Sequence, residues 1–269
     1  MIKFFRKIRQ KLLLENKISG YLKYGIGEIF IVVIGILIAL SINNWNEGRK
    51  ARAQELSTMK EIIENLKYDI LRCEGNSSRN IDQLMGLDSL RISIGNAIKG
   101  NDETVNVYYF ALKYGQDYSE VTLNRSGYDQ LINSETIQLI DNRKLVQDLA
   151  DYYERKSFAV LELVPGPALI NMKTMQRKFI RFRDLNDYIQ SFDVIDDVSF
   201  GPDYEYTDLL KMGQLEMLKP EGLKLDDYLN EIAQFQIDLK NYNFYVSWLK
   251  EAAEKLIEGI EKEYQLKKD

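Results

Sequence analysis

Glu28 is the residue of this sequence whose position most invites a chemical interpretation. It lies near the start of the apolar run YGIGEIFIVVIGILIALSINNW, which extends from Tyr24 to Trp45. An ionisable side chain inside a membrane span can carry protons, pair with a neighbouring helix, or reach the lipid headgroups if it lies near the end of the span. The position of Glu28, about one turn inside the run, favours an interfacial or packing role for this intramembrane acid, and proton-linked function stays open.

A basic cluster in the second half of the chain is a weak candidate for an anion site. It contains Arg177, Lys178, Arg181 and Arg183 in a main body that is otherwise acidic. Arg177 and Arg181 are four residues apart, so a helix would place both guanidinium groups on one face, where they could bind phosphate or carboxylate. The alternative interpretation is that these side chains pair with acidic neighbours or stay in solvent.

A group of acidic residues follows, in a stretch without helical periodicity. It consists of Asp193, Asp196, Asp197, Asp203 and Glu205. Carboxylate oxygens are ligands for calcium, but this spacing fits no calcium-binding loop, so a solvated acidic loop is the prediction and no metal is expected.

The residue types that are missing exclude much of enzyme chemistry. The chain of 269 residues has no histidine and one cysteine, Cys73. It therefore lacks an imidazole base, a Ser-His or Cys-His pair, and a zinc site built on histidine and cysteine. Cys73 falls on an apolar helical stripe, which predicts a core thiol. We predict that the protein is not an enzyme and binds no cofactor.

The apolar run is long enough to be a transmembrane anchor. From residue 26 to 42 it is interrupted only by Glu28 and Ser41. With its first residues the run covers about 19 residues, roughly 28 Å as a helix, against a bilayer core of about 30 Å. Tyr21, Tyr24 and Trp45 flank it, where aromatic side chains favour the membrane interface. A cleaved signal peptide is the alternative, but the long charged segment ahead of the run favours an uncleaved anchor at 24–45.

Charge around the run predicts its orientation. Seven basic residues precede Tyr24, at positions 3, 6, 7, 9, 11, 17 and 23, with one acid, Glu15. The tail therefore has a charge of +6 and the remainder of the chain −11, which together give the net charge of −5. The positive-inside rule then places the N-terminus in the cytoplasm and residues 46–269 outside it, on the periplasmic side of a bacterial inner membrane. An acidic main body argues against nucleic acid as a partner.

The tail and the run also carry patterns that indicate contacts. Apolar residues of the tail 1–23 fall on one helical stripe among the basic ones, which predicts an amphipathic helix on the lipid bilayer; a basic flank without structure is the alternative. Inside the run, Gly27, Gly35 and Ala39 recur on a four-residue spacing. Small residues at this spacing favour helix packing in membranes, so a homo-oligomer is expected.

Apolar periodicity beyond the anchor predicts an all-α domain. Residues at three- and four-residue spacing run from Leu56 to Ile98, with a possible break near Gly75, and again from Leu225 to Ile260 over five heptads. Shorter helices are indicated between them, and no alternating strand pattern stands out. We predict two long antiparallel coiled-coil-like helices with a smaller helical cap, forming an elongated bundle.

Two stretches of the chain resemble a known family. GEIFIVVIGILIALSINNWNE and SGYDQLINSETIQLIDNRKLVQDLADYY are similar to a family of uncharacterised single-span, N-terminally anchored membrane proteins of Bacteroidota, a domain of unknown function. The resemblance implies an inner-membrane protein with a helical extracytoplasmic region, and it implies no reaction.

The function predicted from all these features is a scaffold or assembly protein that contacts itself or another envelope protein. A sensor or ligand-binding bundle is the alternative.

Overall fold

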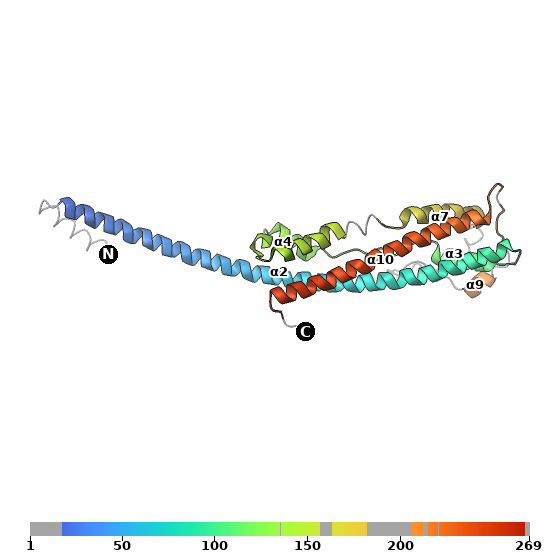
Figure 1. Ribbon diagram of the computed structural model, residues 1–269, viewed down its shortest axis with the longest axis horizontal. Helices are drawn as coiled ribbons and strands as arrows, with labels where there is room; N and C mark the ends of the chain where they lie inside the picture. The colour runs from blue at the N-terminus through green and yellow to red at the C-terminus, as the bar shows by residue number, and fades with distance from the viewer. Residues whose placement is uncertain are drawn as a thin grey trace. The chain divides into compact units, whose positions relative to one another are not determined.

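The computed structural model describes residues 18–134, 136–156, 163–181, 206–211, 215–219 and 221–266, and all regular elements among them are helices (Figure 1). This confirms the predicted all-α class. The chain divides into two compact units, Met1–Ser57 and Thr58–Asp269. Most of the predicted amphipathic tail and the acidic group at 193–205 lie outside the described residues.

The described part of the first unit is a single helical segment. It belongs to α2, Ile18–Ile98, the longest helix of the chain at 81 residues. Every large apolar side chain between Ile26 and Ile42 is at least 40% exposed. This helix is long and apolar enough to cross a membrane, as the sequence predicts for the anchor.

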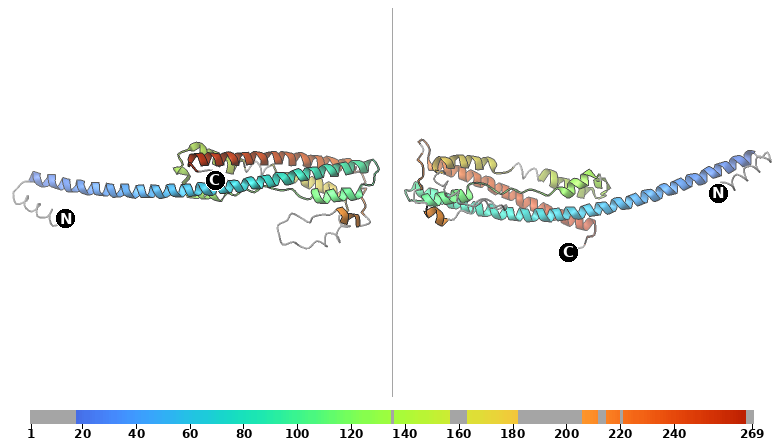
Figure 2. Two further views of the ribbon diagram at one scale, coloured as in Figure 1. Left: turned by 90° about the horizontal axis from the view of Figure 1, so that it is seen from below. Right: turned by 180° about the vertical axis from the view of Figure 1, so that it is seen from behind.

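In the second unit, the remainder of α2 pairs with α10, Leu225–Glu263. The two helices run antiparallel, because Met59 shares a core cluster with Ile260 at one end, and Ile94 shares another with Tyr228 at the other end. They lie side by side in all views (Figures 1 and 2). The apolar stripe predicted for α10 is buried as expected: Tyr228, Ile232, Phe235, Leu239, Tyr242, Val246, Leu249, Ala253, Leu256 and Ile260.

The shorter helices pack along this pair and complete its two core clusters. They are α3 (Thr104–Tyr114), α4 (Ser126–Asn133), η1 (Thr136–Leu139), α5 (Arg143–Ala150), η2 (Asp151–Lys156), α7 (Gly166–Phe179) and α9 (Tyr206–Lys211). The cluster nearer residue 59 takes side chains from α4, α5 and η2, and the cluster nearer residue 94 takes them from α3, α7 and α9. In Figure 1, α7 lies along α10.

Local sequence explains several helix ends. The Asn142 side chain accepts a hydrogen bond from the Leu145 N–H at 3.1 Å and so caps α5. At the start of α10, the Asp227 carboxylate accepts from the Lys224 N–H at 2.7 Å. Gly115 follows the last residue of α3, and its N–H donates to the Ala111 carbonyl at 3.2 Å.

Three expectations about helix extent and burial are wrong. No break occurs at Gly75, because α2 continues through it. Ile81 and Ile98 do not belong to the core, since they are 49% and 45% exposed. The helix α7 ends at Phe179, and Ile180 adopts an extended conformation, so Arg177 and Arg181 do not share a helix face.

Candidate functional site

A line of buried polar side chains runs along α2 where the sequence predicts apolar core. This polar stripe consists of Asn65, Asp69, Asn76, Asn80 and Gln83, at spacings of three, four and seven residues. All five are less than 9% exposed. Buried polar groups need hydrogen-bond partners, so the stripe must face other polar groups.

The Asn80 amide donates to Asn76, and the other four, Asn65, Asp69, Asn76 and Gln83, bond to the connector 115–125, which joins α3 to α4 and has no regular secondary structure. Its backbone groups cannot be satisfied by a helix or a sheet of its own, so side chains must satisfy them. The Asn76 amide donates to the Ser119 carbonyl at 2.6 Å, and the Gln83 amide donates to the carbonyl of Asp117. The stripe therefore fastens the connector along α2.

Two further side chains, one from α2 and one from α10, also bond to the connector. The Arg72 guanidinium donates to the Thr122 carbonyl at 3.0 Å and also to the Thr122 hydroxyl. From α10, the Tyr242 hydroxyl accepts from the Val121 N–H at 2.8 Å. The connector is thus bonded to both long helices.

Asp69 is the most unusual member of the polar stripe. It is 0% exposed, and its two carboxylate oxygens accept from the Asn124 N–H at 2.8 Å and from the Tyr152 hydroxyl at 3.2 Å. Burial raises the pKa of Asp69 from 3.8 to about 6, because it disfavours the charged form more than these hydrogen bonds and the Arg72 charge favour it. The carboxyl group holds backbone and side chain in place, since both of its oxygens are engaged by the protein.

A small hydrogen-bonded network surrounds Asp69 at the start of α4. The Asn124 amide donates to the Asn65 oxygen at 2.9 Å, and the Asn65 amide donates to the Ser126 hydroxyl at 3.0 Å. Gly127 follows directly, and a Cβ atom there would lie 2.9 Å from Ile62 of α2. Only glycine allows this close approach of α4 to α2.

Three tyrosines cover the other side of Asp69. Tyr152 and Tyr153 come from η2, a π-helix, a form that often occurs at functional positions. The Tyr153 ring stacks on Tyr128 at 4.7 Å and meets Tyr152 edge to face at 4.8 Å. These rings are buried, as expected of core aromatics, and they exclude water from the carboxylate.

Cys73 lies one turn after Asp69 and is buried, as predicted. Burial, followed by the Asp69 charge, raises the pKa of this thiol to about 12. A thiol with such a pKa stays protonated at neutral pH and is a poor nucleophile. The group around Asp69 therefore fits a structural role, in which it holds the connector and η2 against α2, better than a catalytic one.

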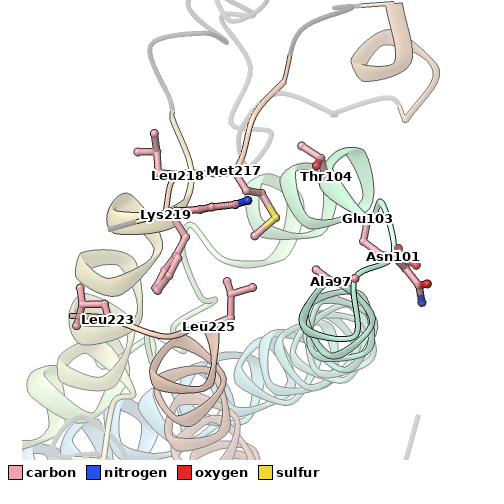
Figure 3. A pocket seen from close by; sticks show the side chains of 11 residues that line it. Ala97, Asn101, Glu103, Thr104, Met217, Leu218, Lys219, Leu223 and Leu225 are labelled. Atoms are coloured by element: carbon pink, nitrogen blue, oxygen red, sulfur yellow. The ribbon is translucent and has the colours of Figure 1, made fainter. Parts of the chain in front are cut away.

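A pocket of about 390 Å³ lies at the other end of the second unit (Figure 3). It is formed where α2 ends, α3 and α10 begin, and the segment 215–219 meets the end of α7. Its lining is mixed: Phe179, Met217, Leu223 and Leu225 are apolar, and Asn101, Glu103, Thr104 and Lys219 are polar or charged. Lys219 is the one basic side chain that lines it among the described residues, and Figure 3 shows its amino group close to Met217.

One acidic side chain, Glu103, also lines this pocket. Its two oxygens accept from the Asn96 amide at 3.2 Å and from the Asn106 amide. The Glu103 carboxylate is thus bonded to side chains of α2 and α3, whereas Lys219 is an exposed residue. The pocket therefore presents one acidic and one basic side chain beside its apolar ones.

The predicted basic cluster does not converge on one point within the described residues. Arg177 is exposed on α7. Arg181 lies beyond the helix, where its backbone N–H donates to the Tyr108 hydroxyl at 2.9 Å and its guanidinium lies 3.9 Å from Glu216. Arg183 lies outside the described residues. Anion binding by this cluster stays a prediction.

The predicted membrane residues lie on α2. Gly27, Gly35 and Ala39 are exposed, and a Cβ atom at either glycine would meet no neighbour within 4 Å. Glu28 is half-buried in the same helix. Trp45 is 69% exposed, and the Arg49 guanidinium lies 5.7 Å from its ring. Tyr21 and Tyr24 lie in α2, but their side chains are outside the described residues.

The polar stripe is the feature that sequence reasoning misses. Its residues occupy the same helical face as Leu66, Cys73 and Leu87, so helical phase places them in the core. That signal is present in the sequence, but a pattern search for apolar residues passes over it. Within the described residues, no group of three or more Asp, Glu, Cys or His side chains is placed to hold a metal ion.

Comparison with known proteins gives one match. A family model described as "Family of unknown function (DUF6090)" matches residues 28–202, which include the apolar part of α2, the polar stripe, the connector and η2. No curated protein and no solved structure matches the chain. Because the matched residues make up more than half of the chain, the protein belongs to this family of unknown function, DUF6090.

Proposed function

We propose that this protein is a membrane-anchored extracytoplasmic scaffold that acts through protein–protein contacts. The apolar part of α2 supplies the anchor, and the basic tail ahead of Tyr24 supports a cytoplasmic N-terminus. The second unit then works outside the cytoplasm, on the periplasmic side of a bacterial inner membrane. Its partner is a second copy or another envelope protein.

The observation that carries this proposal is an exposed apolar stripe on the outer face of α10. Ile237 is 52%, Phe244 is 68% and Trp248 is 38% exposed, and their spacing of seven and four residues places them on one side of the helix. The Tyr245 ring lies 5.6 Å from Phe244 and 6.3 Å from Trp248, so the aromatic surface is continuous. Exposed aromatic surfaces of this kind are enriched at protein interfaces.

The outer face of α2 adds to this surface. Leu71, Met85 and Ile92 are 65%, 58% and 65% exposed, and they lie on one side of the helix at multiples of seven residues. The opposite side of each long helix is already buried in the unit's own core. Both helices therefore offer a second apolar face to a partner.

A charge placed on the α10 stripe tests the proposal. Phe244→Glu in the full-length chain is expected to abolish chemical crosslinks in membranes, because a carboxylate cannot be buried unpaired in an interface. Ser247→Glu is the matched control, since Ser247 is an exposed polar residue of the same helix, lies off the line of the stripe and receives the same charge. Unchanged crosslinking of the Phe244 variant, with its helical content intact, would remove the α10 stripe as an interface.

Cysteine crosslinking separates the two kinds of partner. Cys73 is the single cysteine and is buried, so Phe244→Cys introduces the one reactive thiol of the chain. A disulfide-linked dimer under mild oxidation shows two copies meeting at α10. Crosslinks to another protein without that dimer show a different envelope protein as partner.

Orientation has its own test. A reporter enzyme that works only outside the cytoplasm, fused after Asp269, is expected to be active, because basic charge is concentrated before Tyr24. Activity of a cytoplasm-only reporter at the same position would reverse the proposed orientation.

Ligand binding in the pocket near Lys219 is the second candidate function. The apolar side chains of the lining and the exposed Lys219, together with a Glu103 carboxylate already bonded to two amides, favour an amphipathic anion. The fluorescent anion anilinonaphthalene sulfonate is expected to bind, and Lys219→Gln is expected to weaken its binding about tenfold by removing the paired charge. Equal binding by the parent and by Ala97→Phe, which fills the pocket, would place the dye elsewhere.

A further inference from the structure

The exposed apolar stripe of α10 has one polar residue on its line. Asn241 is exposed and lies between Ile237 and Phe244, so the line reads Ile237, Asn241, Phe244 and Trp248 at intervals of four, three and four residues. This alternating spacing is that of the a and d positions of a coiled coil. These four residues, the α10 seam, lie on the side of the helix that faces away from its buried residues.

We propose that the α10 seam pairs with the same seam of a second copy of this chain, with the two helices parallel and in register. The inference rests on the proposed function, because it names the partner of the exposed α10 stripe. An anchor that inserts in one orientation gives every copy the same direction relative to the bilayer. Two copies related by a two-fold axis perpendicular to the membrane then present this seam to each other in parallel.

Asn241 favours this arrangement over the others that the seam allows. A carboxamide has both donors and an acceptor, so two facing Asn241 side chains can donate to each other. In an antiparallel pair centred on the seam, Ile237 would face Trp248, and Asn241 would face Phe244. The amide would then be buried against a ring without a partner, and the same cost arises against any wholly apolar surface. A single asparagine at an a position fixes register and oligomer state in coiled coils in this way.

The charges beyond the seam are compatible with parallel pairing. After Trp248 the line continues with Glu251 and Lys255, whose side chains lie 3.9 Å apart within one copy. In a parallel pair, each carboxylate has ammonium groups of both copies nearby, which offsets the repulsion between like charges. Before Ile237 the line continues with Gln234, which is exposed and uncharged. The apolar part of the seam is therefore bounded on both sides by polar residues.

Disulfide formation at position 241 tests the pairing in membranes. Cys73 is buried, so Asn241→Cys in the full-length chain has one reactive thiol per copy. A disulfide needs Cβ atoms about 4 Å apart, a distance that only directly facing positions approach. Mild oxidation of Asn241→Cys is expected to give a linked dimer. Ser247→Cys, which is exposed on the same helix but off the seam, is expected to stay monomeric. Absence of the Asn241→Cys dimer, or equal linking of Ser247→Cys, would overturn the proposal.

The direction of pairing has a separate test that leaves Asn241 in place. In a parallel pair, Ile237→Cys is expected to form a disulfide with its own counterpart. In an antiparallel pair, copies with Ile237→Cys would link instead to copies with Trp248→Cys when the two variants are expressed together. The mixed link without the link between two Ile237→Cys copies would overturn the parallel register.

Failure of this inference can be distinguished from failure of the proposed function. If Phe244→Glu abolishes crosslinks to another protein while Asn241→Cys and Ile237→Cys stay monomeric, the α10 stripe is an interface and the second copy is wrong as its partner. If Phe244→Glu leaves all crosslinks unchanged and neither cysteine variant dimerises, both proposals are wrong.

Discussion

Gly86 is expected to be the glycine of α2 whose replacement by alanine most strongly destabilises the protein. A Cβ atom at this position would lie 2.1 Å from Cγ and 2.2 Å from Cδ2 of the Tyr114 ring. These atoms are at the root of the ring, so Tyr114 must leave its rotamer and its place against α2. In an open helix position, the same change would stabilise by about 1 kcal/mol, because alanine has the higher helix propensity.

The cost of displacing the Tyr114 ring exceeds the gain in helix propensity, so the sign of the change in stability can be predicted. Tyr114 is half-buried and packs against the core cluster nearer residue 94. Complete removal of a buried aromatic side chain costs about 3 to 5 kcal/mol, so displacement of this half-buried ring costs about 2 to 3 kcal/mol. After the gain in helix propensity, Gly86→Ala is expected to lower the free energy of unfolding by about 1 to 2 kcal/mol.

Gly75→Ala is the matched control for this prediction. It lies on the same helix, and a Cβ atom there would meet nothing within 4 Å, so its replacement is expected to stabilise the protein by about 0.5 to 1 kcal/mol. Thermal unfolding of the full-length protein in detergent, followed by circular dichroism, measures both variants. If the melting temperature of Gly86→Ala rises as much as that of Gly75→Ala, the close packing of Tyr114 on α2 is wrong.

Two further variants test the core and the anchor. Leu249→Ala is expected to destabilise the second unit by about 2 to 5 kcal/mol, because this side chain of α10 is buried in the core cluster nearer residue 59. An unchanged melting temperature would contradict the packing of α10 against α2. Glu28→Gln is expected to leave membrane insertion unchanged, whereas Ile34→Glu is expected to impair it, since a charge near the centre of a span costs about 2.5 to 3.5 kcal/mol. Equal insertion of both variants, measured by membrane fractionation, would place Glu28 at another depth.

The sequence by itself determined the helices and the pairing of the two longest ones. The stripe from Tyr228 to Ile260 recurs every three or four residues for the length of α10, and such a face has to be buried against a similar one. The apolar run from residue 26 to 42 is equally clear, because its composition and length alone make this segment long and apolar enough to cross a membrane. These features depend on local periodicity, which is a property of the chain alone.

Only the tertiary structure decided what α2 binds in the middle of its length. Asn76, Asn80 and Gln83 have the composition of a solvent-exposed face, and Ile81 beside them has that of a core residue. Asn76 and Gln83 bond to the connector 115–125, which follows them in the chain only after α3 and has no periodicity of its own, and Asn80 bonds to Asn76. Towards this part of α2 the connector presents backbone carbonyls, so the complementary surface of α2 has to be polar. Helical phase places these residues on the core side of α2, but only the position of the connector explains why that part of the core is polar.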